Sequence, residues 1–189
     1  SYEKMGQYEI GIRYYTKASK IDQLYHQAWF GVGTCLAFKE NWLEATHFFK
    51  KAIKIDPLNE AYLNSLAASE YSLGNSVSAI ETYEQLSQLE SVKPAVWLDW
   101  SRIYYDQGDY KKALSVIERG LSETPDESTY LYRKAVYLLA YGRYKEAMVF
   151  LEQALILNYD GHAEVYVFFE DLTTQKALFK IIDQYRKDD

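Results

Sequence analysis

Catalysis and metal binding need particular side chains close together, and the sequence offers few candidates. The three histidines, His26, His47 and His162, are scattered, whereas a metal site needs several ligands converging on one point. Cys35 is the only cysteine, which excludes an intrachain disulfide and a paired-cysteine metal site. We therefore interpret Cys35 as a structural thiol within a helix and predict that the chain binds no metal.

Nucleotide binding and acid–base catalysis are also disfavoured by the residue pattern. The run Gly31-Val32-Gly33 lacks the third glycine and the preceding strand that a dinucleotide-binding loop requires. We interpret Gly33 as a packing glycine instead. The carboxylates are plentiful, but their spacing suits pairing with lysines on solvated helix faces. The sequence thus predicts a protein with no enzymatic activity and no cofactor.

Composition and charge narrow the classes of partner. The chain has 189 residues, of which 48% are hydrophobic and 25% charged, as is ordinary for one globular domain or one short solenoid. Its formal net charge of −6 argues against nucleic acid and anionic membrane surfaces, since both attract dense positive charge. The sequence contains no long apolar run and no secretory signal pattern. We expect no nucleic acid or membrane partner, a cytoplasmic location, and a segment excised from a longer protein.

The elements that organise these residues are internal repeats with a period of 34 residues. One column of the repeat holds small residues: Gly11, Ala45, Ala79, Ala113 and Ala147. Four residues later a column holds large residues: Tyr15, Phe49, Tyr83, Ile117 and Leu151. A third column, three residues further on, is mostly small: Ala18, Ala52, Leu86, Gly120 and Ala154. Residues with these spacings share one helical face, on which small side chains let neighbouring helices approach and large ones fill the space between them.

A further column marks the turns between helices. Its members are Gly6, Glu40, Gly74, Gly108 and Gly142. Glycine tolerates the left-handed backbone conformation with which many helices end. Each period therefore reads as two antiparallel helices of about a dozen residues.

The repeats resemble the tetratricopeptide repeat family, whose pattern is Trp-x2-Leu-Gly-x2-Tyr, then Ala-x3-Phe, then Pro. Residues 26–59 match this pattern at Trp29, Val32, Gly33, Leu36, Ala45, Phe49 and Pro57. Residues 94–127 match it at Trp97, Trp100, Ser101, Tyr104, Ala113, Ile117 and Pro125. Residues 60–93 and 128–161 match more loosely. The resemblance covers nearly the whole chain and implies an all-α, right-handed superhelical solenoid of antiparallel helix pairs.

The expected domain organisation is one solenoid of four full repeats with partial repeats at both ends. Residues 1–25 form a partial first repeat, mainly its second helix at 7–22, whose apolar face has lost the helix that should cover it. The full repeats are 26–59, 60–93, 94–127 and 128–161, and residues 162–189 form a partial repeat with a capping helix. In this last part we expect a helix over 162–172 and a cap over 175–186, because solenoids need a terminal helix with a polar outer face.

The resemblance also implies where a partner would bind. In this family the first helix of each repeat faces a concave groove, and positions two, five, nine, twelve and thirteen reach the ligand. Carried over position by position, the candidate peptide-binding residues are Phe30, Thr34, Phe38, Asn64, Tyr71, Leu98, Arg102, Tyr105, Tyr132 and Tyr166.

The chemistry of these positions favours aromatic contacts over a clamp for acidic peptide tails. Members that clamp such tails use several cationic and amide side chains, and only Arg102 and Asn64 resemble them here. Asp99 and Asp106 lie within one helical turn of Arg102 and are expected to neutralise it. Aromatic side chains bury large areas at interfaces, although the tyrosines could instead pack between repeats.

Two charged residues occupy columns that are otherwise apolar or aromatic. Lys134 stands where other repeats have Val32, Leu66 or Trp100, and Glu70 stands where they have residues such as Leu36. We expect their stems to pack while their charges reach water.

The sequence favours a non-enzymatic scaffold that binds a protein or peptide in the groove of a repeat array. Two alternatives remain open. The segment could be the regulatory or localising arm of a larger protein whose activity lies elsewhere, or it could be a self-assembly module that forms a homodimer.

Overall fold

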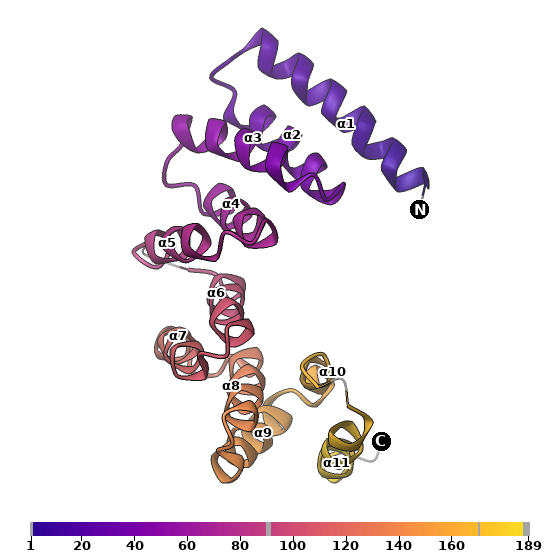
Figure 1. Cartoon of the computed structure of the whole chain (residues 1–189), viewed down its shortest axis with the longest axis vertical. Helices are drawn as coiled ribbons and strands as arrows, with labels where there is room; N and C mark the ends of the chain where they lie inside the picture. The colour runs from indigo at the N-terminus through magenta and orange to yellow at the C-terminus, as the bar shows by residue number, and fades with distance from the viewer. Residues whose placement is uncertain (1, 90–91, 170, 187–189) are drawn as a thin grey trace. The chain divides into compact units, whose positions relative to one another are not determined.

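The computed structural model describes residues 2–89, 92–169 and 171–186, and these residues form helices joined by short turns. No strand occurs within the described ranges, so the all-α prediction is confirmed. None of the described helices is long and apolar enough to cross a membrane. The helices are α1 Tyr2–Ile21, α2 His26–Phe38, α3 Trp42–Ile55, α4 Glu60–Ser72, α5 Ser76–Leu86, α6 Pro94–Asp106, α7 Tyr110–Glu123, α8 Ser128–Ala140, α9 Tyr144–Leu157, the 3₁₀ helix η1 Tyr159–His162, α10 Ala163–Tyr166 and α11 Leu172–Asp183 (Figure 1).

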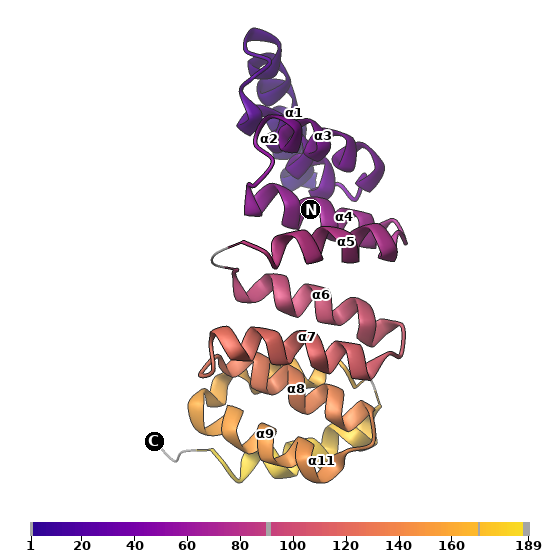
Figure 2. The same cartoon turned by 90° about the vertical axis from the view of Figure 1, so that its left-hand side faces the viewer.

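The chain divides into two compact units, residues 1–92 and residues 93–189. In the N-terminal unit, α1 packs on α2, and helices α2 to α5 pack as successive neighbours along the chain. In the C-terminal unit, α6 to α9 do the same (Figure 2), while α10 packs against α8. Helix pairs joined by short turns are the repeating unit in both.

The turn column adopts the left-handed backbone conformation that its glycines suggest. The φ angles are 83° at Gly74, 75° at Gly108 and 82° at Gly142, and Glu40 reaches 59° without being glycine. In contrast, the turn expected at Gly6 is wrong, because α1 runs through this residue as one continuous helix. A single glycine weakens a helix by only about 1 kcal/mol, which the remaining residues of a 20-residue helix offset.

Replacing Glu40 with glycine should stabilise the N-terminal unit by about 1 kcal/mol, because a left-handed backbone strains any residue that carries a Cβ atom. The thermal midpoint should rise by about 2–4 °C. The reverse change at the equivalent turn, Gly74→Glu, should lower it by a similar amount. If both variants melt like the wild type, the backbone strain at this turn is negligible.

The columns of small and large residues form the core, as the sequence predicts. Ala45, Ala79, Ala113 and Ala147 are fully buried, and their large partners Phe49, Tyr83, Ile117 and Leu151 are at most 1% exposed. A Cβ atom at Gly33 would lie 2.6 Å from Phe49 and 3.2 Å from the carbonyl oxygen of Ala45. Gly33 is therefore the packing glycine that the repeat pattern suggests.

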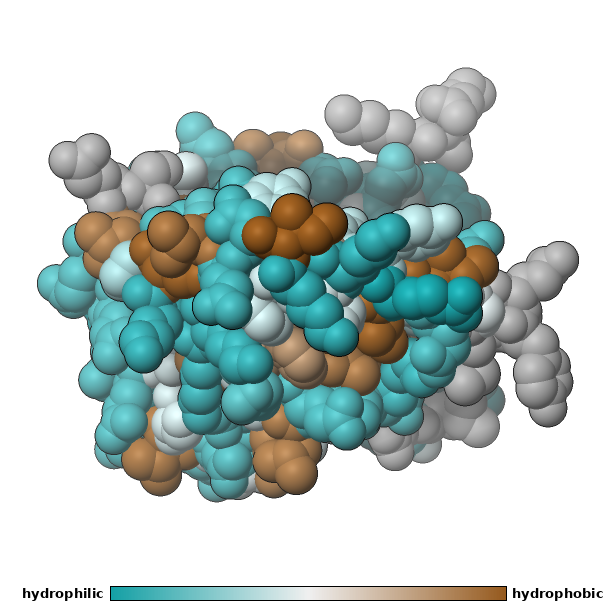
Figure 3. All heavy atoms as spheres, turned by 90° about the horizontal axis from the view of Figure 1, so that it is seen from above, coloured by the Kyte–Doolittle hydropathy of each residue, from teal (hydrophilic) through white to brown (hydrophobic). Residues whose placement is uncertain are grey.

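The first helix, α1, exposes several apolar side chains. Ile10 is 51% exposed, Tyr14 70% and Ile21 79%. Figure 3 shows one face of the protein, on which hydrophobic residues interrupt a mostly hydrophilic surface.

The C-terminal segment differs from the expected helix over 162–172. Residues 159–162 form the 3₁₀ helix η1, and α10 covers only Ala163–Tyr166. The three residues after α10, Val167, Phe168 and Phe169, have modest helix propensity. Asp171 starts a new helix by accepting a 2.7 Å hydrogen bond from the Thr174 backbone N–H. The final helix, α11, consequently begins three residues before the expected 175, and it buries Leu178 and Ile182.

Candidate peptide-binding surfaces

In the N-terminal unit, α2 and α4 carry five of the candidate residues. Phe30, Thr34 and Phe38 follow one another at four-residue spacing on α2, so they lie along one face of that helix. Phe30 is half-buried and packs against Phe49 and Tyr62, with ring centroids 5.5 Å and 4.5 Å apart. The exposed end of this stripe is Phe38, which is 65% exposed and stacks on Tyr8.

A small apolar hollow lies between α2, α3 and α4. Its volume is about 220 Å³, and we call it the α2–α4 hollow. It is lined by Thr34, Ala37, Phe38, Trp42, Phe49, Ser65, Ala68 and Ser69. Small side chains on one side leave the hollow open, and aromatic rings form its other sides. The hollow therefore suits an apolar side chain of a ligand. It includes the predicted Thr34 and Phe38 but not Phe30, Asn64 or Tyr71.

The sequence interpretation omitted Trp42, Ser65 and Ser69 from the site. Ser65 and Ser69 lie four residues apart on α4 and flank Ala68, a residue at a family contact position. A cluster of small residues beside exposed aromatic residues is the sequence signal that could have located the hollow.

Asn64 carries an unusual buried atom. Its side-chain oxygen Oδ1 is inaccessible to water and has no hydrogen-bond partner among the described residues. Buried polar atoms in proteins are nearly always paired. Because this oxygen is enclosed and Asn64 does not line the α2–α4 hollow, it is not exposed to a ligand in this structure.

In the C-terminal unit, the structure contradicts the expected exposure of Tyr132. This side chain is fully buried, and its hydroxyl donates a 2.6 Å hydrogen bond to the carbonyl oxygen of Asn158. Burial raises the pKa of Tyr132 to about 12. The ring also packs on Gly161, so η1 covers it, and Tyr132 is a packing residue rather than a contact residue.

The other four candidates of this unit are partly accessible. Leu98, Arg102 and Tyr105 lie on α6, and Tyr105 stacks on Tyr137 of α8 with ring centroids 5.0 Å apart. Tyr166 lies on α10 and lines a separate hollow with Lys176 and Phe179 of α11.

The charge of Arg102 is balanced as predicted, but by one of the two expected carboxylates. Its Nε donates a 2.8 Å hydrogen bond to Asp106 Oδ1. Asp99 interacts electrostatically with Arg133 instead. The side chain of Asp99 is exposed, yet surrounding protein desolvates it and raises its pKa, an effect that the positive charge of Arg133 partly offsets.

The two charged residues in apolar columns behave differently. Lys134 is 13% exposed, and its ammonium group lies 3.0 Å from Glu118 and 4.1 Å from the centre of the Phe150 ring. For Glu70 the expectation of a charge reaching water is wrong, because this residue is only 4% exposed. Its two oxygens accept hydrogen bonds from Lys50 at 2.7 Å and Asn75 at 2.8 Å.

The described residues offer little for catalysis. They contain no group of three or more histidine, cysteine, aspartate or glutamate side chains that could hold a metal ion. Burial raises the pKa of the Cys35 thiol, which makes this residue a poorer nucleophile at neutral pH.

Comparisons with known proteins agree with the repeat pattern. The family model described as tetratricopeptide repeat matches residues 1–60 and 98–161. Protein CTR9 homolog of Arabidopsis thaliana is 31% identical over 125 residues, which are 66% of this chain and 12% of that protein. Small glutamine-rich tetratricopeptide repeat-containing protein 2 of Mycosarcoma maydis is 32% identical over 79 residues, or 42% of this chain and 22% of that protein. The chain thus spans less than a quarter of the length of these curated relatives.

Solved structures share the fold at low sequence identity. A crystal structure of MamA has a TM-score of 0.71 and 19% identity, with 88% of both chains covered. The crystal structure of YrrB, described as a TPR protein with an unusual peptide-binding site, has a TM-score of 0.63 and 12% identity, covering 92% of this chain and 93% of that one. The family match extends over more than half of the chain, and the chain therefore belongs to the tetratricopeptide repeat family, whose members are generally non-catalytic scaffolds for protein–protein interaction.

Proposed function

We propose that this chain binds a segment of another protein along the first helices of its repeats, and that apolar contacts dominate the interaction. The observation that carries the proposal is the α2–α4 hollow. It combines an exposed aromatic ring, Phe38, with a floor of small residues that leaves room for a partner side chain. The similarity to YrrB, a protein described as having a peptide-binding site, supports a peptide as the ligand.

The lining of the hollow also includes three hydroxyl-bearing residues, Thr34, Ser65 and Ser69. The residues that line the hollow are uncharged, so binding should weaken only modestly as salt concentration rises. A clamp for acidic peptide tails would need several free cations instead.

The experiment begins with a peptide selected from a random display library against the wild-type chain. Amide chemical shifts of the chain, measured by NMR as this peptide is added, should move chiefly in α2 and α4. Shift changes confined to the outer faces of α3 and α5 would contradict the proposal.

Self-association is a second candidate function, favoured by the apolar side chains that α1 exposes. If α1 pairs with a second copy, light scattering at low micromolar concentration should give the mass of a dimer. Replacing Tyr14, which is 70% exposed, with glutamate should then restore the monomer mass, because an interface cannot easily bury an unpaired charge. A monomer mass for the wild-type chain would exclude this candidate.

A further inference from the structure

An aromatic side chain of the C-terminal segment lies against helices from two earlier repeats. Phe168 follows α10, and its ring meets Tyr105 edge-on, with centroids 5.1 Å apart. A second edge-on contact joins it to Tyr137 at 6.1 Å. The guanidinium carbons of Arg102 and Arg133 each lie 4.6 Å from the centre of the same ring. Two cations and two aromatic rings therefore surround one phenyl group.

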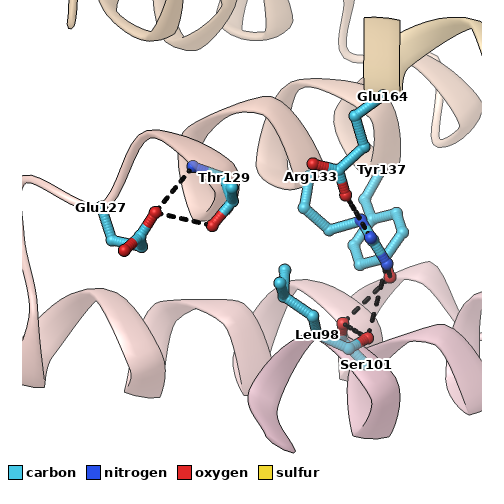
Figure 4. A network of polar contacts seen from close by, with 7 residues as sticks. All are labelled: Leu98, Ser101, Glu127, Thr129, Arg133, Tyr137 and Glu164. Carbon is cyan, nitrogen blue, oxygen red and sulfur yellow. Dashed lines mark hydrogen bonds and ion pairs between the residues drawn. The ribbon is translucent and has the colours of Figure 1, made fainter. Parts of the chain in front are cut away.

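The same segment supplies a carboxylate to this surface. Glu164, one helical turn before Phe168, accepts hydrogen bonds at Oε1 from Nε of Arg133 at 3.1 Å and from its Nη2 (Figure 4). Arg133 also donates to the carbonyl oxygen of Leu98 at 3.4 Å. The carboxylate and the phenyl ring of the segment are thus both held by Arg133.

The receiving side of this contact is built into the repeats. Tyr137 is fully buried, and its hydroxyl is 2.9 Å from Oγ of the buried Ser101, which fixes the ring between α6 and α8 (Figure 4). Tyr105 stacks on Tyr137, and Arg102 is anchored by Asp106. We call the set Arg102, Tyr105, Arg133 and Tyr137 the α6–α8 pocket.

The segment that occupies the α6–α8 pocket, residues 164–168, has less regular structure than the helices that form the pocket. Its helix, α10, has four residues, and the backbone hydrogen bonds that follow it are long, at 3.3 Å from Phe168 N–H and 3.4 Å from Phe169 N–H. Val167, between the two, is 65% exposed. A short segment whose backbone hydrogen bonds are long can open locally and be exchanged for a competitor.

We propose that the α6–α8 pocket is a recognition site for a phenyl ring one helical turn after a carboxylate, and that residues 164–168 occupy it as an internal ligand. The partner is then a short helical peptide with glutamate or aspartate at one position and phenylalanine four residues later. Charge complementarity supports this chemistry, because Arg133 pairs with the carboxylate of the occupant while Arg102 has Asp106 as its own partner. The inference rests on the proposed function, since it names a ligand for one of the first-helix surfaces.

The test uses a fluorescent peptide with the sequence of residues 162–169, titrated into the full chain and followed by anisotropy. The wild-type pocket is occupied, so binding should be weak. The double variant Glu164→Gln, Phe168→Ala vacates the pocket and should bind the peptide at least tenfold more tightly. The matched control is Glu164→Gln, Phe169→Ala, because Phe169 lines a different hollow with Leu139 and Leu178. That control should bind tenfold less tightly than the vacated variant.

Two further arms test the recognition chemistry. A peptide with alanine in place of its last-but-one residue, equivalent to Phe168, should lose the tenfold gain. Adding Arg133→Ala to the vacated variant should abolish it as well. Equal binding of the peptide by the wild type and the vacated variant, with both folded by circular dichroism, would overturn the inference. Because the library-selected peptide reports on the α2–α4 hollow in the other unit, its binding shows separately whether the proposed function holds.

Discussion

Replacing Lys50 with methionine should lower the free energy of unfolding by about 2 kcal/mol at pH 7, because it leaves the buried Glu70 carboxylate without its cation. In the wild type, Glu70 is 4% exposed and accepts a 2.7 Å hydrogen bond from Lys50. The Lys50 side chain is itself 59% exposed, so the expected loss is smaller than for a fully buried pair. Methionine keeps the apolar stem and removes only the charge.

The loss should depend on pH with a definite sign. Burial alone would raise the pKa of Glu70, but hydrogen bonds from Lys50 and Asn75 outweigh burial and hold the pKa below its usual range. Ionised Glu70 therefore stabilises the wild type above the unfolded-state pKa, and this contribution disappears as the pH falls through the lower folded-state pKa. Without Lys50, burial should raise the folded-state pKa instead. Protonation then relieves the variant, so the gap between variant and wild type should narrow as the pH falls from 7 to 4.

Urea unfolding followed by circular dichroism at several pH values measures this gap. Lys54→Met, on an exposed position of the same helix, is the control and should change stability by less than about 0.5 kcal/mol. The double variant Lys50→Met, Glu70→Gln should recover part of the loss at pH 7, because glutamine can keep the bond to Asn75. A gap that stays constant with pH would show that Glu70 is not the source of the effect.

Replacing Phe38 with alanine should weaken the binding of a library-selected peptide by about 2 kcal/mol, roughly thirty-fold, because aromatic anchors dominate interfaces of this kind. Phe38 is the exposed wall of the α2–α4 hollow and is 65% exposed in the free chain. Its removal should leave the fold intact, since the side chain contributes little to the core.

Titration calorimetry on the folded variants measures this change in affinity. Tyr14→Ala removes an aromatic ring of similar exposure from α1 and should leave peptide affinity unchanged. Arg102→Ala should also have little effect on this peptide, and affinity should fall less than tenfold between 0.1 M and 0.5 M salt. A steep salt dependence with no loss for Phe38→Ala would mean that charge, rather than apolar contact, drives binding.

The fold could be predicted from the sequence because each repeat places small and large residues at the same spacing. Alanine columns such as Ala45 and Ala79 and large partners such as Phe49 occur at the fixed spacing that two packed helices require. Four of the five turn positions adopt the left-handed backbone conformation, because the turn between two packed helices recurs at the same place in each repeat. At Glu40 this requirement outweighs the residue's own preference for a negative φ angle.

The ends of the chain were less predictable because the repeat rule weakens there. The turn expected at Gly6 is wrong because α1 continues through this residue as one helix. The helix expected over 162–172 failed because the Asp171 cap and the run of valine and phenylalanine residues compete locally with the repeat register.

The candidate site was only partly predictable, because the position of a residue within the repeat does not determine which other elements pack against its side chain. Tyr132 occupies a family contact position, yet η1 covers it. The contact of Phe168 with Tyr105 joins residues 63 positions apart. No periodic pattern encodes that contact, so it became visible only in three dimensions.

We propose that partner segments bind the first-helix surface of the N-terminal unit through the α2–α4 hollow. Ala68 forms part of its floor, so Ala68→Leu should fill the space without removing any existing contact. Val77, 72% exposed on α5, provides the matched substitution Val77→Leu away from the hollow. The most direct measurement is the Kd of a library-selected peptide for these two variants. We expect at least a tenfold loss of affinity for Ala68→Leu and wild-type affinity for Val77→Leu, and equal affinity of both variants would contradict binding through the hollow.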